Sequence, residues 1–177
     1  MRLFLGLRSL LFLILIPGTV AGYIPWRILK ASRQLTLPLL SISSVLAAGL
    51  VLLGICVLLI CVWDFFQTGR GTLAPFDPPK QLVVRGLYRF TRNPMYNGVV
   101  TLLLGEAWFF HSSALLQYAL AVFIMFHLMV VIYEEPALAG RFAESYRGYR
   151  ATVPRWGFTT RPFADQRSDD GGQRWDR

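Results

Sequence analysis

Apolar residues in this chain come in long unbroken runs rather than in the alternating patterns of soluble amphipathic helices or strands. The clearest run, from Gln34 to Trp63, holds no charged residue over 30 positions. About 20 apolar residues are enough for a helix to cross the hydrocarbon core of a bilayer. The run therefore predicts a membrane-spanning helix that is tilted or begins in the interface.

A second run, from Asn93 to Tyr133, has 41 residues, and its only charge is Glu106. As one helix it would be about 60 Å long, roughly twice the thickness of the hydrocarbon core. The run must therefore fold back, and its only turn-like break is His111-Ser112-Ser113. We expect a hairpin of two spans, Pro94 to Phe110 and Ala114 to Tyr133.

Folding the chain about this turn brings two charged clusters to one end of the hairpin. Arg89 and Arg92 precede the first span, and Glu134 and Glu135 follow the second. Folding about Ser112 places Arg89 at the depth of Glu135 and Arg92 at the depth of Ile132. The sequence thus predicts a basic cluster and a carboxylate pair on the same membrane face.

The remaining span is predicted at the N-terminus, from Leu3 to Tyr23. This run is also compatible with a signal peptide that is cleaved near Ala21. Pro25 and Trp26 are typical of an interfacial anchor, so we favour an uncleaved span. With the runs above, the pattern predicts about four spans.

After Glu135, apolar residues recur at helical spacing, which is typical of an amphipathic helix lying in the membrane interface. Beyond about Arg161 the chain is polar and contains glycine, as disordered segments do. The predicted fold is all-α: a polytopic membrane protein with about four transmembrane helices, a C-terminal interfacial helix and a disordered tail. We expect a single domain over residues 1–160 and the tail over 161–177. The apolar positions of the interfacial helix are Leu138, Phe142, Tyr146, Tyr149 and Val153.

Composition and charge agree with a membrane location. Hydrophobic residues make up 54% of the chain and charged residues only 16%, while the net charge is +8. The basic residues lie beside the apolar runs, so they indicate anionic lipid and topology rather than nucleic acid. With four spans, the basic loop at 64–93 and the C-terminal tail face the cytosol. Cys56 and Cys61 lie inside a span, and we predict neither a disulfide nor a metal site.

The segment Arg92-Asn93-Pro94-Met95-Tyr96 has the features of a helix start that binds an anion. Proline is favoured in the first turn, and the N–H groups that follow it suit a carboxylate or a phosphate. The alternative is an ordinary helix start with basic flanking residues. Glu134 and Glu135 oppose the helix dipole, so they need a nearby cation. That cation is either a ligand or one of the neighbouring arginines.

Three positions inside the hairpin admit both a structural and a functional interpretation. His127 falls at the depth of Asn97, and a neutral histidine hydrogen-bonded to Asn97 is favoured over a catalytic role. Glu106 lies deeper, and a structural carboxyl group is favoured there. Gly98 begins a stripe of small residues that serves either helix packing or ligand space.

Several of these segments together resemble the isoprenylcysteine carboxyl methyltransferase family, and phospholipid N-methyltransferases are similar over the same elements. The resemblance covers about residues 71–156, which would be the cofactor half of the domain. It is carried by Gly86 to Tyr96, Leu104-Gly105-Glu106, Glu134-Glu135, and Phe142 to Trp156 with its ending Val153-Pro154-Arg155-Trp156.

The resemblance implies an enzyme that uses S-adenosyl-L-methionine and acts in the membrane without a dinucleotide-binding domain. Many relatives have histidine where Asn93 stands here, so a proton-handling role at this position is in doubt. Catalytic residues are not assigned, and the candidates are Arg89, His127 and Arg155. The residues implied to bind the cofactor are Arg92, Asn93, Pro94, Met95, Tyr96, Gly98, Glu134, Glu135 and Tyr146.

The expected function is methylation of a lipid or lipid-modified acceptor, of the isoprenylcysteine carboxylate type, at the cytosolic interface. One alternative is a phospholipid N-methyltransferase, whose ammonium acceptor must lose a proton before it is methylated. Another is a non-enzymatic membrane scaffold with the same helical frame. The sequence does not identify the acceptor or the oligomeric state.

Overall fold

The computed structural model describes residues 16–34, 40–68 and 84–163, and every regular element among them is helical. Three predicted features lie outside these residues: the first part of the N-terminal span, the basic positions Arg70 and Lys80 of the loop at 64–93, and the tail from 164 onward. The elements are η1 (Thr19–Tyr23), α2 (Ile24–Ala31), α3 (Ile42–Thr68), η2 (Gly86–Arg89), α4 (Pro94–Phe109), α5 (Ser113–Met129), η3 (Val130–Glu134) and α6 (Glu135–Thr152).

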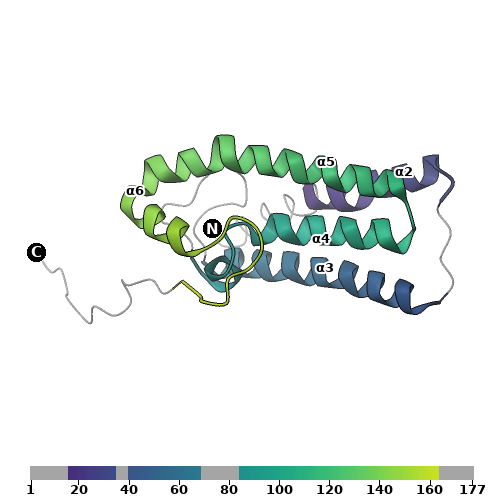
Figure 1. The fold of residues 1–177 in the computed structure, drawn as a ribbon, viewed down its shortest axis with the longest axis horizontal. Helices are drawn as coiled ribbons and strands as arrows, with labels where there is room; N and C mark the ends of the chain where they lie inside the picture. Colours follow the sequence, from purple (N-terminus) through teal and green to yellow (C-terminus); the bar gives the residue numbers. More distant parts are fainter. Residues whose placement is uncertain (1–15, 35–39, 69–83, 164–177) are drawn as a thin grey trace, which may run out of the picture.

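The predicted hairpin is confirmed. Helices α4 and α5 run antiparallel, α4 lies between α5 and α3, and the turn between α4 and α5 falls at His111 and Ser112 (Figure 1). His111 takes a positive φ of 50°, and the Ser112 side chain caps α5 by accepting a hydrogen bond from the Leu115 N–H. The break in the apolar run is therefore a true helix stop followed by an N-cap.

Helices α3 and α4 pack closely because glycines lie along their contact. A Cβ atom built on Gly54 would come within 2.7 Å of the Gly98 carbonyl oxygen, and one on Gly105 within 2.7 Å of the Val51 backbone nitrogen. A Cβ on Gly98 would approach Val57 at 3.1 Å. Between the two interpretations of the small-residue stripe, the structure thus supports helix packing.

The N-terminal helix extends further than the sequence indicated. Instead of ending near Tyr23, it continues through the π-helical turn η1 into α2, which ends at Ala31. Pro25 is tolerated within this continuous helix because the π-helical turn η1 directly before it changes the hydrogen-bond pattern at this point. Arg27 and Lys30, which follow the predicted span, are therefore helical.

Two helical stretches are long and apolar enough to cross a membrane, Ile42–Asp64 and Ser113–Thr152. The first begins at Ile42 rather than at Gln34, and residues 35–39 lie outside the described part. The second combines the fourth predicted span with the interfacial helix, which we had expected to be separate. They are continuous because the π-helical turn η3 joins α5 to α6 without a break. Helix α4, with 16 residues, forms as predicted but is short for a span.

Helix α6 changes direction at Ala143, whose φ of 35° and ψ of −103° are not helical. The second half of α6 therefore turns back toward the ends of α3 and α4 (Figure 1). Tyr146, Tyr149 and Val153 are buried there and form a small core with the partly buried Leu138 and Phe163. The kink thus places the C-terminal part of α6 over the end of the hairpin where the charged clusters meet.

Candidate functional site

The two charged clusters are in direct contact, as the fold-back of the hairpin predicted. Arg92 Nη1 lies 2.9 Å from Glu135 Oε1, although the residues are 43 positions apart. Arg155 approaches the same carboxylate from the segment after α6, with Nε 2.6 Å from Oε1 and Nη2 2.9 Å from Oε2. One buried carboxylate thus pairs with two arginines, and the pair with Arg155 is bidentate.

The segment after α6 is held against the start of α4 by backbone contacts as well. The Arg92 N–H donates to the Pro154 carbonyl oxygen at 3.0 Å. The Asn93 side chain donates to the Arg155 carbonyl oxygen at 3.1 Å. Residues 154–156 therefore belong to the same end of the hairpin as the helix start that the sequence singled out.

The charges around Glu135 determine its ionisation. Burial alone would raise the pKa of Glu135, but the hydrogen bonds from Arg155 and the charges of Arg92 and Arg155 outweigh it. The pKa of this carboxyl group is held below its usual value. Glu135 is therefore a carboxylate whose charge is balanced within the protein.

Glu134 has a different environment. Its carboxylate accepts a hydrogen bond from the Tyr96 hydroxyl group of α4. Burial raises the pKa of Glu134, the hydrogen bond from Tyr96 lowers it, and the neighbouring charge of Glu135 raises it, with a net upward shift. Within the described residues, no lysine or arginine forms an ion pair with Glu134. Arginines therefore balance the charge of Glu135, whereas no arginine or lysine among the described residues balances that of Glu134.

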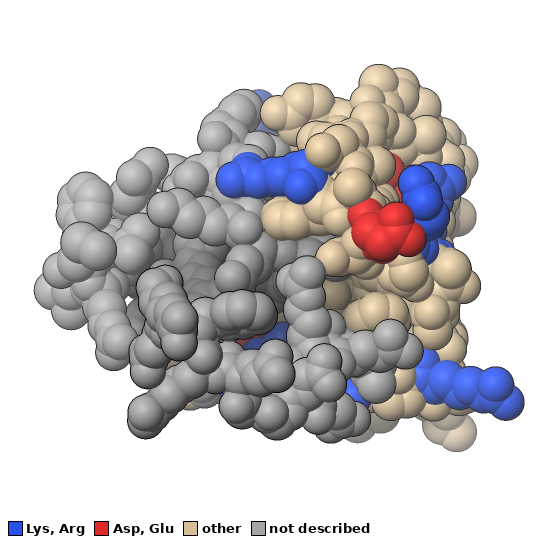
Figure 2. Space-filling view, turned by 90° about the vertical axis from the view of Figure 1, so that its left-hand side faces the viewer, with Lys and Arg blue, Asp and Glu red and all other residues tan. Residues whose placement is uncertain are grey.

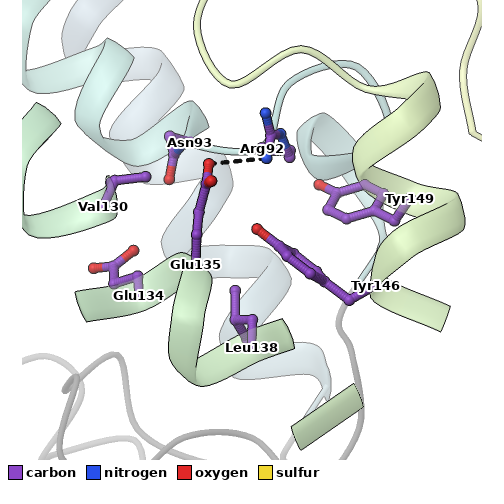
Figure 3. A pocket seen from close by; sticks show the side chains of 8 residues that line it. All are labelled: Arg92, Asn93, Val130, Glu134, Glu135, Leu138, Tyr146 and Tyr149. Atoms are coloured by element: carbon purple, nitrogen blue, oxygen red, sulfur yellow. Dashed lines mark hydrogen bonds and ion pairs between the residues drawn. The ribbon is translucent and has the colours of Figure 1, made fainter. Parts of the chain in front are cut away.

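A small pocket lies between these groups, with about 240 Å³ of space that includes its open mouth. Figure 3 shows Glu135 directed toward Arg92, Tyr146 approaching from α6, and Glu134 directed away from the ion pair. The cavity itself has a volume of about 30 Å³, far below the 300–1,000 Å³ of typical ligand pockets. The lining residues are Arg92, Asn93, Val130, Glu134, Glu135, Leu138, Tyr146 and Tyr149.

The pocket has polar groups that are suited to an anion as well as a cation. Asn93 is the N-cap of α4 but makes no capping hydrogen bond with its side chain, so the first N–H groups of the helix have no side-chain acceptor. The buried Arg92 Nε also has no hydrogen-bond partner among the described residues. Basic and acidic side chains lie side by side on this end of the molecule (Figure 2). A ligand with a carboxylate and an ammonium group would satisfy both the donors and Glu134.

Of the nine residues expected to bind a cofactor, five line this pocket: Arg92, Asn93, Glu134, Glu135 and Tyr146. Tyr96 reaches it through its hydrogen bond to Glu134, while Pro94 is buried in the first turn of α4. Met95 packs on the main apolar core, and Gly98 lies against α3, so both are outside the pocket.

The three candidate catalytic residues lie at different places. Arg155 is bonded to Glu135, and Arg89 donates from Nε to the Phe163 carbonyl oxygen at 3.0 Å. His127 accepts a hydrogen bond at Nδ1 from the Trp156 indole, at 3.0 Å. The contact that we considered between His127 and Asn97 does not form, because the Asn97 amide donates to Thr91 instead.

Three lining residues were not among the predicted site residues: Val130, Leu138 and Tyr149. Leu138 and Tyr149 belong to the apolar face predicted for the interfacial helix, which was the signal available in the sequence. Tyr149 also donates to the Tyr88 carbonyl oxygen at 2.6 Å, so it links α6 to η2.

A family model described as phospholipid methyltransferase matches residues 42–145, which is more than half of the chain. The chain belongs to the phospholipid methyltransferase family. The match covers α3, the hairpin of α4 and α5, and most of α6, including Arg92 and both glutamates. No curated protein and no solved structure matches the chain.

Membership in the phospholipid methyltransferase family agrees with the two strongly apolar helices. Together they indicate a membrane protein. The suspected relationship to membrane methyltransferases of the isoprenylcysteine and phospholipid type is therefore confirmed at the level of the family.

Proposed function

We propose that this protein transfers a methyl group from S-adenosyl-L-methionine to a lipid or lipid-modified acceptor at the cytosolic interface. The observation that carries the proposal is the different state of the two adjacent glutamates. Glu135 is neutralised by Arg92 and Arg155, whereas Glu134 lines the pocket and has Tyr96 as its one hydrogen-bond partner among the described residues. A partly buried carboxylate without a cation is suited to a ligand that brings a positive charge.

The residues of the pocket fit the chemical groups of this cofactor. Glu134 would hold its ammonium group, while the start of α4 and Arg92 would hold its carboxylate. Tyr146 offers an aromatic face at the pocket for the adenine ring or the sulfonium. When bound, the cofactor supplies an electrophilic methyl group on a sulfonium.

Methyl transfer needs alignment of the two reactants and exclusion of water more than it needs acid–base groups. The buried ion pairs of Glu135 fix the ends of α4 and α6 relative to each other, which is what alignment requires. The pocket is smaller than a typical ligand site, so cofactor binding requires these elements to separate to some extent.

The acceptor is either a carboxylate, as in an isoprenylcysteine, or the amine of a phospholipid. A carboxylate needs no base, and Arg89 is the candidate to bind it because Arg155 already pairs with Glu135. An amine must lose a proton first. His127 is poorly suited to accept it, because Trp156 occupies Nδ1 and the other ring nitrogen then carries the proton of the neutral form. The family description favours the phospholipid.

The test is calorimetric titration of the purified full-length protein with S-adenosylhomocysteine. We expect binding by the wild type that Glu134→Gln weakens by about tenfold to a hundredfold, the value of a charge-assisted hydrogen bond. Glu144→Gln is the matched control, because Glu144 is exposed and contacts only Arg147 among the described residues. Absence of binding by a folded wild-type protein would instead support a non-enzymatic scaffold.

Incubation with labelled S-adenosyl-L-methionine then identifies the acceptor. Phosphatidylethanolamine and a farnesylated cysteine are offered separately in nanodiscs, and mass spectrometry detects the methylated product. Methylation of neither substrate, by a protein that binds the cofactor, would contradict the proposed acceptor class.

A further inference from the structure

A second concave region lies outside the charged pocket, between the N-terminal helix and α3. It has about 510 Å³ of space, including its opening, and its lining is almost entirely apolar. Leu102 of α4 forms its base. The N-terminal helix forms one side with Pro17, Gly18, Ala21 and Gly22, and α3 forms the other with Ile55, Leu58 and Leu59. We call this region the apolar groove.

The glycines of the apolar groove differ from those at the contact of α3 and α4. A Cβ atom on Gly18 or Gly22 would meet nothing within 4 Å, whereas one on Gly54 would clash with α4. Gly18 and Gly22 therefore leave open space beside the N-terminal helix instead of allowing helices to approach. The position of this helix is fixed by a hydrogen bond from the Tyr118 hydroxyl to the Val20 carbonyl oxygen, at 2.9 Å.

The position of the apolar groove along α4 corresponds to the hydrocarbon core of a membrane. Leu102 is eight residues beyond Pro94, or about 12 Å along α4, which is within half of the hydrocarbon core. Along α3 the groove continues into apolar side chains that the protein leaves exposed, among them Leu59 at 57% and Leu52 at 61%. In a membrane, lipid chains would therefore surround the groove, as the family and the apolar helices indicate.

The apolar groove is also connected to the charged pocket by packing. Ala21, Leu58 and Leu102 belong to the core cluster against which Tyr96 packs. Tyr96 in turn donates to Glu134 at the pocket. A chain that enters the groove thus lies beside the helix that carries the start of the candidate site.

From these observations we propose that the apolar groove binds one hydrocarbon chain of the lipid acceptor, and that Gly18 and Gly22 set the width available to it. This proposal rests on the proposed function and adds to it the part of the protein that recognises the chain. Lipid tails are as apolar as the groove, so the chain is retained by close packing rather than by the hydrophobic effect. The groove then holds the headgroup of the acceptor near the membrane interface.

The test uses side chains of graded size at Gly22 in the full-length protein in nanodiscs. Methyl transfer to dioleoyl-phosphatidylethanolamine is compared with transfer to the short-chain dihexanoyl lipid. For Gly22→Leu we expect kcat/KM for the long-chain lipid to fall by about tenfold or more, because extra methyl groups in an apolar site exclude part of the substrate. Gly22→Ala should cause a smaller fall. Transfer to the short-chain lipid should change little, and S-adenosylhomocysteine should bind as in the wild type.

The matched control is Gly49→Leu, because a Cβ on Gly49 also meets nothing within 4 Å and this residue does not line the apolar groove. We expect this variant to methylate both the long-chain and the short-chain lipid with the kcat/KM of the wild type. Equal losses for long and short chains with Gly22→Leu, or no loss for either, would overturn the proposal.

A second measurement does not depend on methyl transfer. Phosphatidylethanolamine with a photoreactive diazirine in its chain is crosslinked to the protein, and the adducts are mapped by mass spectrometry. We expect adducts at residues 55–59 and 17–22 that Gly22→Leu reduces and Gly49→Leu does not. Adducts spread evenly over the exposed face of α3 would indicate ordinary surrounding lipid and would reject the groove. If the groove is labelled but no lipid is methylated, the proposed function fails while chain binding stands.

Discussion

Trp156 donates a hydrogen bond from its indole Nε1 to Nδ1 of His127, and this bond joins the segment after α6 to the inner side of α5. Phe123 lies beside both rings, with its centroid 5.2 Å from that of Trp156. A histidine that the sequence offered as a catalytic candidate is thus used to dock the chain that follows α6.

Replacement of Trp156 by phenylalanine tests this docking. The variant keeps an aromatic ring but removes the donor, so we expect a loss of about 1–2 kcal/mol in the free energy of unfolding. Trp26→Phe serves as the control, because Trp26 is 42% exposed. Thermal unfolding in detergent measures both. Combining Trp156→Phe with His127→Leu should cost less than the sum of the single changes, and strict additivity would argue against a direct bond.

Glu135→Gln should reduce stability more than Glu134→Gln does. The first change leaves Arg92 and Arg155 without the carboxylate that neutralises them, at an expected cost of about 2–3 kcal/mol. The second removes a charge that is not paired with a cation, so its effect on unfolding should be below about 1 kcal/mol. Denaturant unfolding of both variants in the same detergent provides the comparison. The reverse order would show that the ion pairs do not stabilise this end of the bundle.

Gly54→Ala should disrupt the packing of α3 on α4. The added Cβ would lie 2.7 Å from the Gly98 carbonyl oxygen, and neither backbone can move without separating the helices. We expect a loss of about 1–3 kcal/mol, as for other overpacked sites. Gly49→Ala, on the same helix with open space around it, should be neutral or slightly stabilising because alanine favours helix. Similar effects of the two substitutions would contradict the packing described for Gly54.

Stability should fall in acid because of Glu135. Its pKa in the folded protein is below the usual 4.5, so its contribution is complete above that pH and is lost as the pH falls through the folded value. Glu134 acts in the opposite direction, since its pKa is raised on folding and its contribution declines as the pH rises through that value. Unfolding measured from pH 7 to pH 3 should therefore show an acid decline that is reduced in Glu135→Gln. If stability declined in acid to the same extent in Glu135→Gln, the decline would come from other carboxyl groups.

The hairpin and the meeting of the two charged clusters could be predicted because both follow from length. A run with a single charge that is twice as long as the hydrocarbon core is thick must turn, and its one turn-like break sets the register of the two arms. The start of α4 and the end of α5 can then be placed at the same end of the hairpin without knowing how the side chains pack.

The contributions of Arg155 and Trp156 could not be predicted in the same way. They depend on the change of direction at Ala143, a residue type that gives no local signal for a positive φ. The length of the N-terminal helix was underestimated for a related reason. A π-helical turn before Pro25 lets the helix pass a residue that usually marks a boundary.

The return of residues 154–156 to the start of α4 has a consequence for the order in which the protein is made. Translation delivers Arg92 and both glutamates well before Arg155, so the hairpin can enter the membrane while the glutamate still lacks one of its two arginines. A nascent chain that is released before Pro154 would keep its apolar helices yet leave this end of the bundle incomplete. The ion pairs at this end of the bundle are therefore completed only after insertion, when the last of these residues leaves the ribosome.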